Sequence, residues 1–195
     1  MHRTKVVRAC IAGALLVAAA GCATKRSAVT FHEPTMDFGL VRTVGVMPFA
    51  NLSTAQTADE RVRDVFMTML QAAGQIYVLP MGEVQRGLSR VEMRDPTAPS
   101  DQDVVALSKV LNCDAVITGS VLEYGEARSG SAAASYISVS VQMLEAKTGK
   151  LVWSAQATKG GITAADRMFG GGGQPMNVVT VAAVNQLLDE LFAAK

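Results

Sequence analysis

The chain has 195 residues, enough for one domain with its own hydrophobic core. Hydrophobic residues make up 49% of it, and 18 basic residues nearly balance 17 acidic ones, which gives a formal net charge of +1. This balance excludes the strong positive field by which proteins attract nucleic acid, so we expect no nucleic-acid partner.

The first 21 residues have the features of a secretory signal peptide. Three basic side chains lie within residues 1–8, and a short apolar run at residues 9–21 leads to Cys22. As a helix, residues 9–23 would span about 22 Å at about 1.5 Å per residue, which is less than the roughly 30 Å hydrocarbon core of a bilayer. Cleavage before Cys22 leaves 15 basic and 17 acidic side chains, a formal charge of −2.

The residues at the cleavage point, Ala19-Ala20-Gly21-Cys22, resemble the lipobox of bacterial lipoproteins. That resemblance implies that Cys22 receives a diacylglycerol thioether and an N-acyl chain and becomes the mature N-terminus. Buried acyl chains, at about 0.8 kcal/mol per methylene, anchor a protein stably. Ala23 follows in place of Asp, and the resemblance therefore implies the periplasmic face of the outer membrane. The alternative is an ordinary signal peptide cut near the same place, with Cys22 incidental.

The mature chain divides into a short tether and one domain. Residues 22–40 lack periodicity and predict a tether that reaches at most roughly 60 Å, so the domain, residues 41–195, stays near its membrane. Once the signal peptide and Cys22 are set aside, Cys113 is the remaining cysteine. An exported domain with one thiol has no internal disulfide, and we expect Cys113 to be a small buried hydrophobe.

The first half of the domain predicts strands separated by helices. A nearly continuous apolar run at residues 43–49 indicates a strand covered on both faces. Thr57 and Glu60 have the spacing of a capping box, and the apolar residues behind them recur at helical spacing as far as Ala73. A strand at residues 76–80, a short helix at residues 82–91 and a helix from Ser100 to Asn112 follow.

The second half predicts adjacent strands and a closing helix. Residues 115–124 are rich in β-branched side chains, and residues 136–143 alternate strictly between apolar and polar, which indicates a strand with one face on a core. A tight turn joins this strand to a second arm at residues 151–158. The full order is β-α-β-α-α-β-β-β-α, which predicts a single α/β domain with a mixed sheet flanked by helices. A flexible loop from Gly170 to Gly173 and a helix at residues 177–194 complete it.

The sequence offers few groups for catalysis. His2 leaves with the signal peptide and His32 falls in the predicted tether, so the domain lacks the histidine that Ser-His-Asp and Cys-His sites need. The glycines from Gly170 to Gly173 lack the Lys-Ser/Thr of a phosphate loop. We expect no enzyme activity, no metal, no small-molecule substrate and no cofactor besides the acyl chains on Cys22.

Four residues are candidates for a contact surface. Tyr136, Ser138 and Ser140 belong to the strand whose second face is directed to water or to a partner. Trp153 is the single tryptophan, and both a core position and an interface position fit it, because tryptophan packs well in cores and is enriched in binding hot spots. The sequence leaves these two alternatives open.

The motifs in their order resemble a known group of envelope proteins. After the lipoprotein signal come Met36-Asp37-Phe38-Gly39, then VGVMPFANLS (residues 44–53), CDAVITGSV (residues 113–121) and TGKLVWS (residues 148–154). This succession is similar to the CsgG-like superfamily of envelope lipoproteins. The superfamily includes the curli secretion subunit, the N-terminal domain of TolB, lipoprotein activators of penicillin-binding proteins and the Pel polysaccharide export lipoprotein.

The resemblance implies a non-enzymatic periplasmic domain that assembles into or supports an export or secretion complex. Its partners would be further copies of itself or other envelope proteins. The chain has one hairpin, which the core needs, whereas two membrane hairpins would require roughly forty residues of alternating pattern at about 9–11 residues per strand. We therefore do not expect a pore from this chain alone. The alternative is a tethered monomeric regulator that activates a cell-wall synthase, a role that the short tether disfavours.

Overall fold

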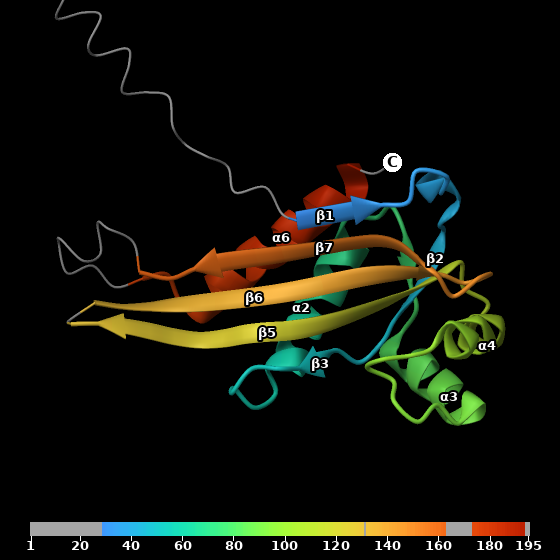
Figure 1. Ribbon diagram of the computed structural model, residues 1–195, viewed down its shortest axis with the longest axis horizontal. Helices are drawn as coiled ribbons and strands as arrows, with labels where there is room; N and C mark the ends of the chain where they lie inside the picture. Colours follow the sequence, from blue (N-terminus) through green and yellow to red (C-terminus); the bar gives the residue numbers. More distant parts are fainter. Residues whose placement is uncertain (1–28, 131, 163–172, 194–195) are drawn as a thin grey trace, which may run out of the picture.

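A seven-stranded mixed sheet carries the fold, and helices cover both of its faces (Figure 1). The computed structural model describes residues 29–130, 132–162 and 173–193. The strands are β1 (Val29–His32), β2 (Thr43–Val46), β3 (Ala50–Asn51), β4 (Tyr77–Val78), β5 (Ala115–Ser129), β6 (Ala132–Glu145) and β7 (Leu151–Gly160). The helices are α2 (Ala58–Ala72), α3 (Met81–Val91), α4 (Asp101–Leu111) and α6 (Met176–Ala193).

The strand order is β1-β7-β6-β5-β2-β4, with β3 also paired to β5. Strands β1, β7, β6 and β5 are antiparallel neighbours, whereas β2, β3 and β4 join the sheet in parallel. The chain moves outward from β2 to β4 through α2 and then back across β2 to β5 through α3 and α4. Right-handed crossovers in opposite directions place their helices on opposite faces of a sheet. This mixed sheet between helices confirms the predicted fold class.

Two hydrophobic clusters follow from this arrangement. The larger one lies between the sheet and helices α2 and α6, and it includes Phe66, Ile117, Val139, Trp153 and Leu187. The smaller one lies where α3 and α4 pack on the opposite face, near β2 and the start of β5. Helices α3 and α4 cover only the part of this face that lies near β2. Most of the face that β5, β6 and β7 form on this side of the sheet therefore carries no helix. Figure 1 is viewed from this side.

The domain begins earlier than the sequence predicted. The structure places residues 29–32 in the sheet as β1, paired antiparallel to β7, and the side chain of Phe38 is buried in a 3-10 turn. The expected tether is therefore wrong for residues 29–40, and residues 23–28 separate Cys22 from the fold. A four-residue strand has too short a pattern to reveal itself locally, because its stability comes from pairing with β7 more than 120 residues later.

One capping box was predicted, at the start of α2, and the structure has one at the start of α4. At α4, the hydroxyl of Ser100 accepts from the Asp103 amide and the Asp103 carboxylate accepts from the Ser100 amide. At α2, Thr57 has a φ of 60° and its side chain makes no capping hydrogen bond, so that prediction is wrong. The loop before α2 explains why Thr57 does not cap this helix. The side chains of Asn51 and Ser53 hold the loop with hydrogen bonds, and Thr57 at its end adopts the left-handed conformation.

Candidate functional site

The uncovered face of β5, β6 and β7 is the surface on which the sequence placed an interface. Ile137 and Val139 on β6 are fully buried in the main core, and the alternation turns Ser138 and Ser140 to the other side. The register then fixes their neighbours, because Ser140 pairs with Ser120 on β5 and with Gln156 on β7. The predicted half-polar strand thus becomes one row of a wider polar surface.

This surface, which we call the polar face, is built from short uncharged side chains. Glu123 pairs with Ser138 beyond a bulge in β5 and places one carboxylate at the margin of the face. Within the face, hydroxyls and amides bond laterally: Ser138 Oγ and Thr158 Oγ1 are 3.0 Å apart, and Gln156 Nε2 donates to Ser138 Oγ at 3.4 Å. The register assigns Tyr136 at the end of the β6 row and the following short polar residues to the polar face: Thr118, Ser120, Ser138, Ser140, Gln142, Ser154, Gln156 and Thr158.

The four candidate contact residues occupy different depths. Ser140 and Tyr136 are half-buried on the polar face and are accessible to a partner, whereas Ser138 is 5% exposed. Trp153 is fully buried, so the hypothesis that it anchors an interface is wrong. Its strand is not an edge, because β1 pairs with β7 on its outer side, and its ring belongs to the core that α6 covers.

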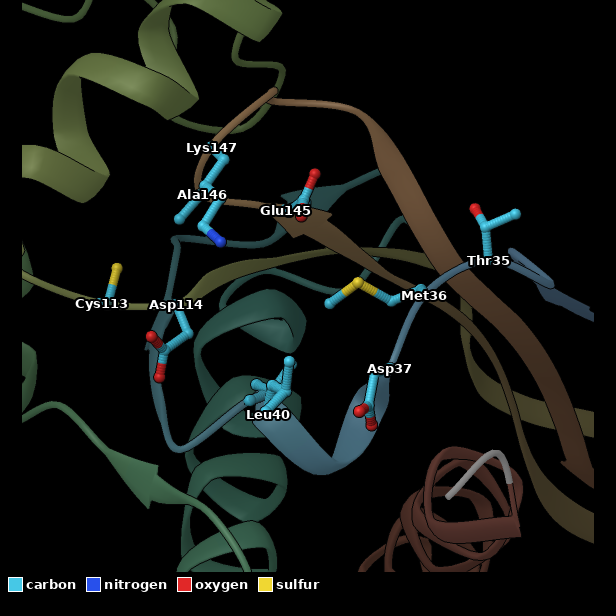
Figure 2. Close-up of a pocket in the computed structure, with 10 residues that line it drawn as sticks. Thr35, Met36, Asp37, Leu40, Cys113, Asp114, Glu145, Ala146 and Lys147 are labelled. Atoms are coloured by element: carbon cyan, nitrogen blue, oxygen red, sulfur yellow. The ribbon is translucent and has the colours of Figure 1, made fainter.

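A hollow of about 300 Å³ lies at one end of the sheet (Figure 2). The linker between β1 and β2, the start of β5 and the β6–β7 turn form its walls. Figure 2 shows Met36 reaching toward the centre, with Leu40 below it and Ala146 and Lys147 on the turn above. Met36 and Asp37, which line the hollow, are the first two residues of the Met36-Asp37-Phe38-Gly39 motif.

The acidic groups of the hollow are engaged with the chain itself. The Asp114 carboxylate accepts two backbone hydrogen bonds at 2.9 Å, from the amides of Arg42 and Thr43. Asp37 Oδ1 accepts from the Gly39 amide at 2.9 Å, and Glu145 accepts from the Thr148 hydroxyl at 2.7 Å. These carboxylates hold turns in place, because side-chain oxygens that accept from nearby backbone amides and hydroxyls stabilise loops.

Cys113 borders the same hollow but is a core residue, as expected. It is 8% exposed and free, and burial raises the pKa of its thiol above the ordinary value. A thiol kept protonated in this way is a weak nucleophile. Within the part of the chain that the structure describes, no three His, Cys, Asp or Glu residues gather into a metal site.

Two exposed apolar residues of β1 are part of the surface that sequence reasoning missed. Val29 and Phe31 are 80% and 43% exposed, and they project on the same side as the polar face. Thr30 and His32 alternate with them, and His32 contacts the ring of Phe38 at 6.2 Å between centroids. The alternating sequence Val-Thr-Phe-His fits a strand but is too short to predict one.

The predicted glycine loop falls largely outside the described residues, which resume at Gly173. The Gly173 amide donates to the carbonyl of Ala133 at 2.8 Å. Across the described ranges, no helix has the length and hydropathy that a membrane span requires. The signal peptide and Cys22 also lie outside the described residues.

Fold and surface together define a single α/β domain with one largely uncovered face of its sheet. A family profile described as GNA1162-like lipoprotein matches residues 40–194. The chain therefore belongs to the GNA1162-like lipoprotein family. A sequence search of curated proteins finds no match.

Solved structures share the fold at low sequence identity. The PelC dodecamer from Paraburkholderia phytofirmans is 14% identical with a TM-score of 0.57, over 84% of this chain and 97% of that one. Lipoprotein GNA1162 from Neisseria meningitidis is 18% identical with a TM-score of 0.54, over 76% of this chain and 99% of that one. The resemblance to envelope lipoproteins is thus confirmed for the fold, while the specific link to the curli secretion subunit stays a prediction.

Proposed function

We propose that this protein is a non-enzymatic outer-membrane lipoprotein whose periplasmic domain assembles with further copies of itself and supports an envelope export or secretion complex. Cys22 carries the diacylglycerol and the N-acyl chain. The observation that carries the proposal is that no helix covers the polar face of strands β5, β6 and β7.

The chemistry of the polar face suits burial against another protein surface. Eight residues of the polar face are Ser, Thr or Gln. Burial of such side chains requires no desolvation of a charge, and Ser and Thr lose little rotamer freedom. Two twisted sheets pack well through faces of small side chains. The dodecameric state of PelC belongs to that protein, and the shared fold makes the same kind of assembly a reasonable expectation.

The proposal of a non-enzymatic role has its own support. The carboxylates around the hollow hold backbone amides or a neighbouring hydroxyl, and the Cys113 thiol is buried with a raised pKa. General acid–base or nucleophilic catalysis needs such groups to be free and directed at a shared point.

Two lysines on the polar face should disperse the assembly. Ser140 and Gln156 are lateral neighbours, so the double variant Ser140→Lys, Gln156→Lys would bury two ammonium groups close together. We expect the native mass of the acylated protein in mild detergent to fall from a discrete multiple of the subunit to the subunit alone. The control variant Thr68→Lys, Gln71→Lys adds the same charge to the exposed side of α2 and should keep the multiple.

An unchanged multiple in the first variant would overturn the assignment of the polar face. A wild-type protein that is already a monomer would overturn self-assembly. It would direct attention to the tethered regulator, although a tether of residues 22–28 gives that role still less reach.

The anchor has a direct test in the mass of the mature chain. We expect wild-type protein to begin at Cys22 with the mass of its acyl chains added and to require detergent for extraction. Cys22→Ser removes the acceptor sulfur and should abolish the added mass and release the domain from membranes. A mature wild-type chain without acyl mass would contradict the anchor whatever the state of assembly.

A further inference from the structure

The outermost strand, β1, presents two large apolar side chains to solvent. Val29 is 80% and Phe31 43% exposed, whereas a stable edge strand in water usually carries charged or shielding residues. Thr30 and His32 lie on the opposite side of the strand, where the Thr30 hydroxyl donates to the Glu190 carboxylate of α6 at 3.1 Å and His32 contacts the ring of Phe38. The strand is thus held in place by its inner side and by β7, and its outer apolar pair is left without a partner among the described residues.

The chain length to the anchor limits where β1 can lie. Val29 is seven residues beyond Cys22, so at about 3.4 Å per residue the strand begins within roughly 24 Å of the sulfur that carries the lipid. Every other described element follows β1 along the chain. Lys25 and Arg26 lie in the connecting segment, and their charges suit the phosphates of lipid headgroups.

We propose that β1 is a second membrane contact, in which Val29 and Phe31 rest in the headgroup region of the same bilayer that holds the acyl chains. This inference depends on the proposed anchor at Cys22. The occupant is a lipid surface because the tether keeps the apolar pair within reach of one. Aromatic and aliphatic side chains partition favourably into the interface, where water still hydrates the free backbone groups of an edge strand.

The contact gives the domain a fixed orientation. A lipid anchor alone lets a domain rotate freely about its tether, whereas a second contact through β1 sets that edge of the sheet against the membrane. The polar face and the opposite edge at β4 then have defined positions relative to the bilayer. An ordered arrangement of copies in the membrane plane requires such a common orientation.

Depth-dependent fluorescence quenching tests the inference on the acylated protein. The probe is an environment-sensitive dye on Phe31→Cys, in a Cys113→Ala background, in vesicles of phosphatidylethanolamine and phosphatidylglycerol with brominated acyl chains. The matched probe is Tyr77→Cys on the opposite edge strand, where the native side chain is 62% exposed. We expect a spectral shift to shorter wavelength and at least twofold stronger quenching at residue 31 than at residue 77, and Val29→Cys should repeat the result.

The outcomes distinguish a failure of the membrane contact from a failure of the proposed anchor at Cys22. Intact mass is measured first, and absence of acyl mass contradicts the anchor. With acylation present, equal quenching at residues 31 and 77 overturns the membrane contact and leaves the anchor intact. The dye at residue 31 could instead show the spectral shift without quenching by brominated lipid. If this shift disappears in the variant Ser140→Lys, Gln156→Lys, a second copy covers Val29 and Phe31, and the inference of a membrane contact is overturned.

Discussion

Replacement of Trp153 by alanine is expected to lower the free energy of unfolding by about 3–5 kcal/mol, the usual cost of an aromatic-to-alanine change in a core. The ring is fully buried between the sheet and α6, so its loss leaves a cavity that the surrounding strands cannot close. Urea unfolding of the domain, followed by circular dichroism, measures the change. A loss below about 1 kcal/mol would contradict the core position.

The conservative change Trp153→Phe sharpens this test. The indole Nε1 has no hydrogen-bond partner among the described residues, so phenylalanine sacrifices no hydrogen bond. We expect a loss of at most about 2 kcal/mol, from the smaller ring volume alone. If Trp153→Phe costs as much as Trp153→Ala, the indole nitrogen has a partner and the packing described here is incomplete.

Gly149→Ala is expected to destabilise the domain by about 2–5 kcal/mol. Gly149 lies in the β6–β7 turn with a φ of 74°, a conformation that costs other residues about 1–2 kcal/mol. An added Cβ would also overlap the carbonyl oxygen of Asp101 at the start of α4, and overpacking of this kind costs about 1–3 kcal/mol. Thermal or chemical unfolding measures the sum.

Gly74→Ala is the matched control for this glycine. Gly74 follows α2 with a φ of 67°, but no atom lies within 4 Å of the place where its Cβ would stand. We expect a loss of about 1–2 kcal/mol, from backbone strain alone. Equal losses of unfolding free energy at the two glycines would show that the β6–β7 turn does not pack on α4. The position of this turn as a wall of the hollow would then be wrong.

The sheet presents two different surfaces for two different tasks in our proposals. The polar face would be covered by another copy, and the apolar edge at β1 would be covered by lipid. The first proposal rests on the broad uncharged face, and the second rests on the pair of exposed apolar residues. They can fail independently, because native mass tests the first and quenching by brominated lipid tests the second.

Much of the fold could be predicted because its signals are local. The alternation at residues 136–143 marks which side chains of β6 enter the core, and Ser100 with Asp103 marks the start of α4. Periodicity and capping depend on neighbours within a few residues, so the sequence carries them directly. The candidate site was predicted in part for the same reason, since Tyr136 and Ser140 do lie on the polar face.

What the sequence determined by itself is therefore which residues share a face, where the main helices and strands run, and the lipoprotein motif that predicts an anchor at Cys22. Tertiary structure alone decided what covers each face. Pairing of β1 with β7 made the end of the expected tether a strand and left Phe31 exposed, and the packing of α6 on the sheet buried Trp153. That pairing joins segments more than 120 residues apart, and its stability comes from contacts that no local pattern records.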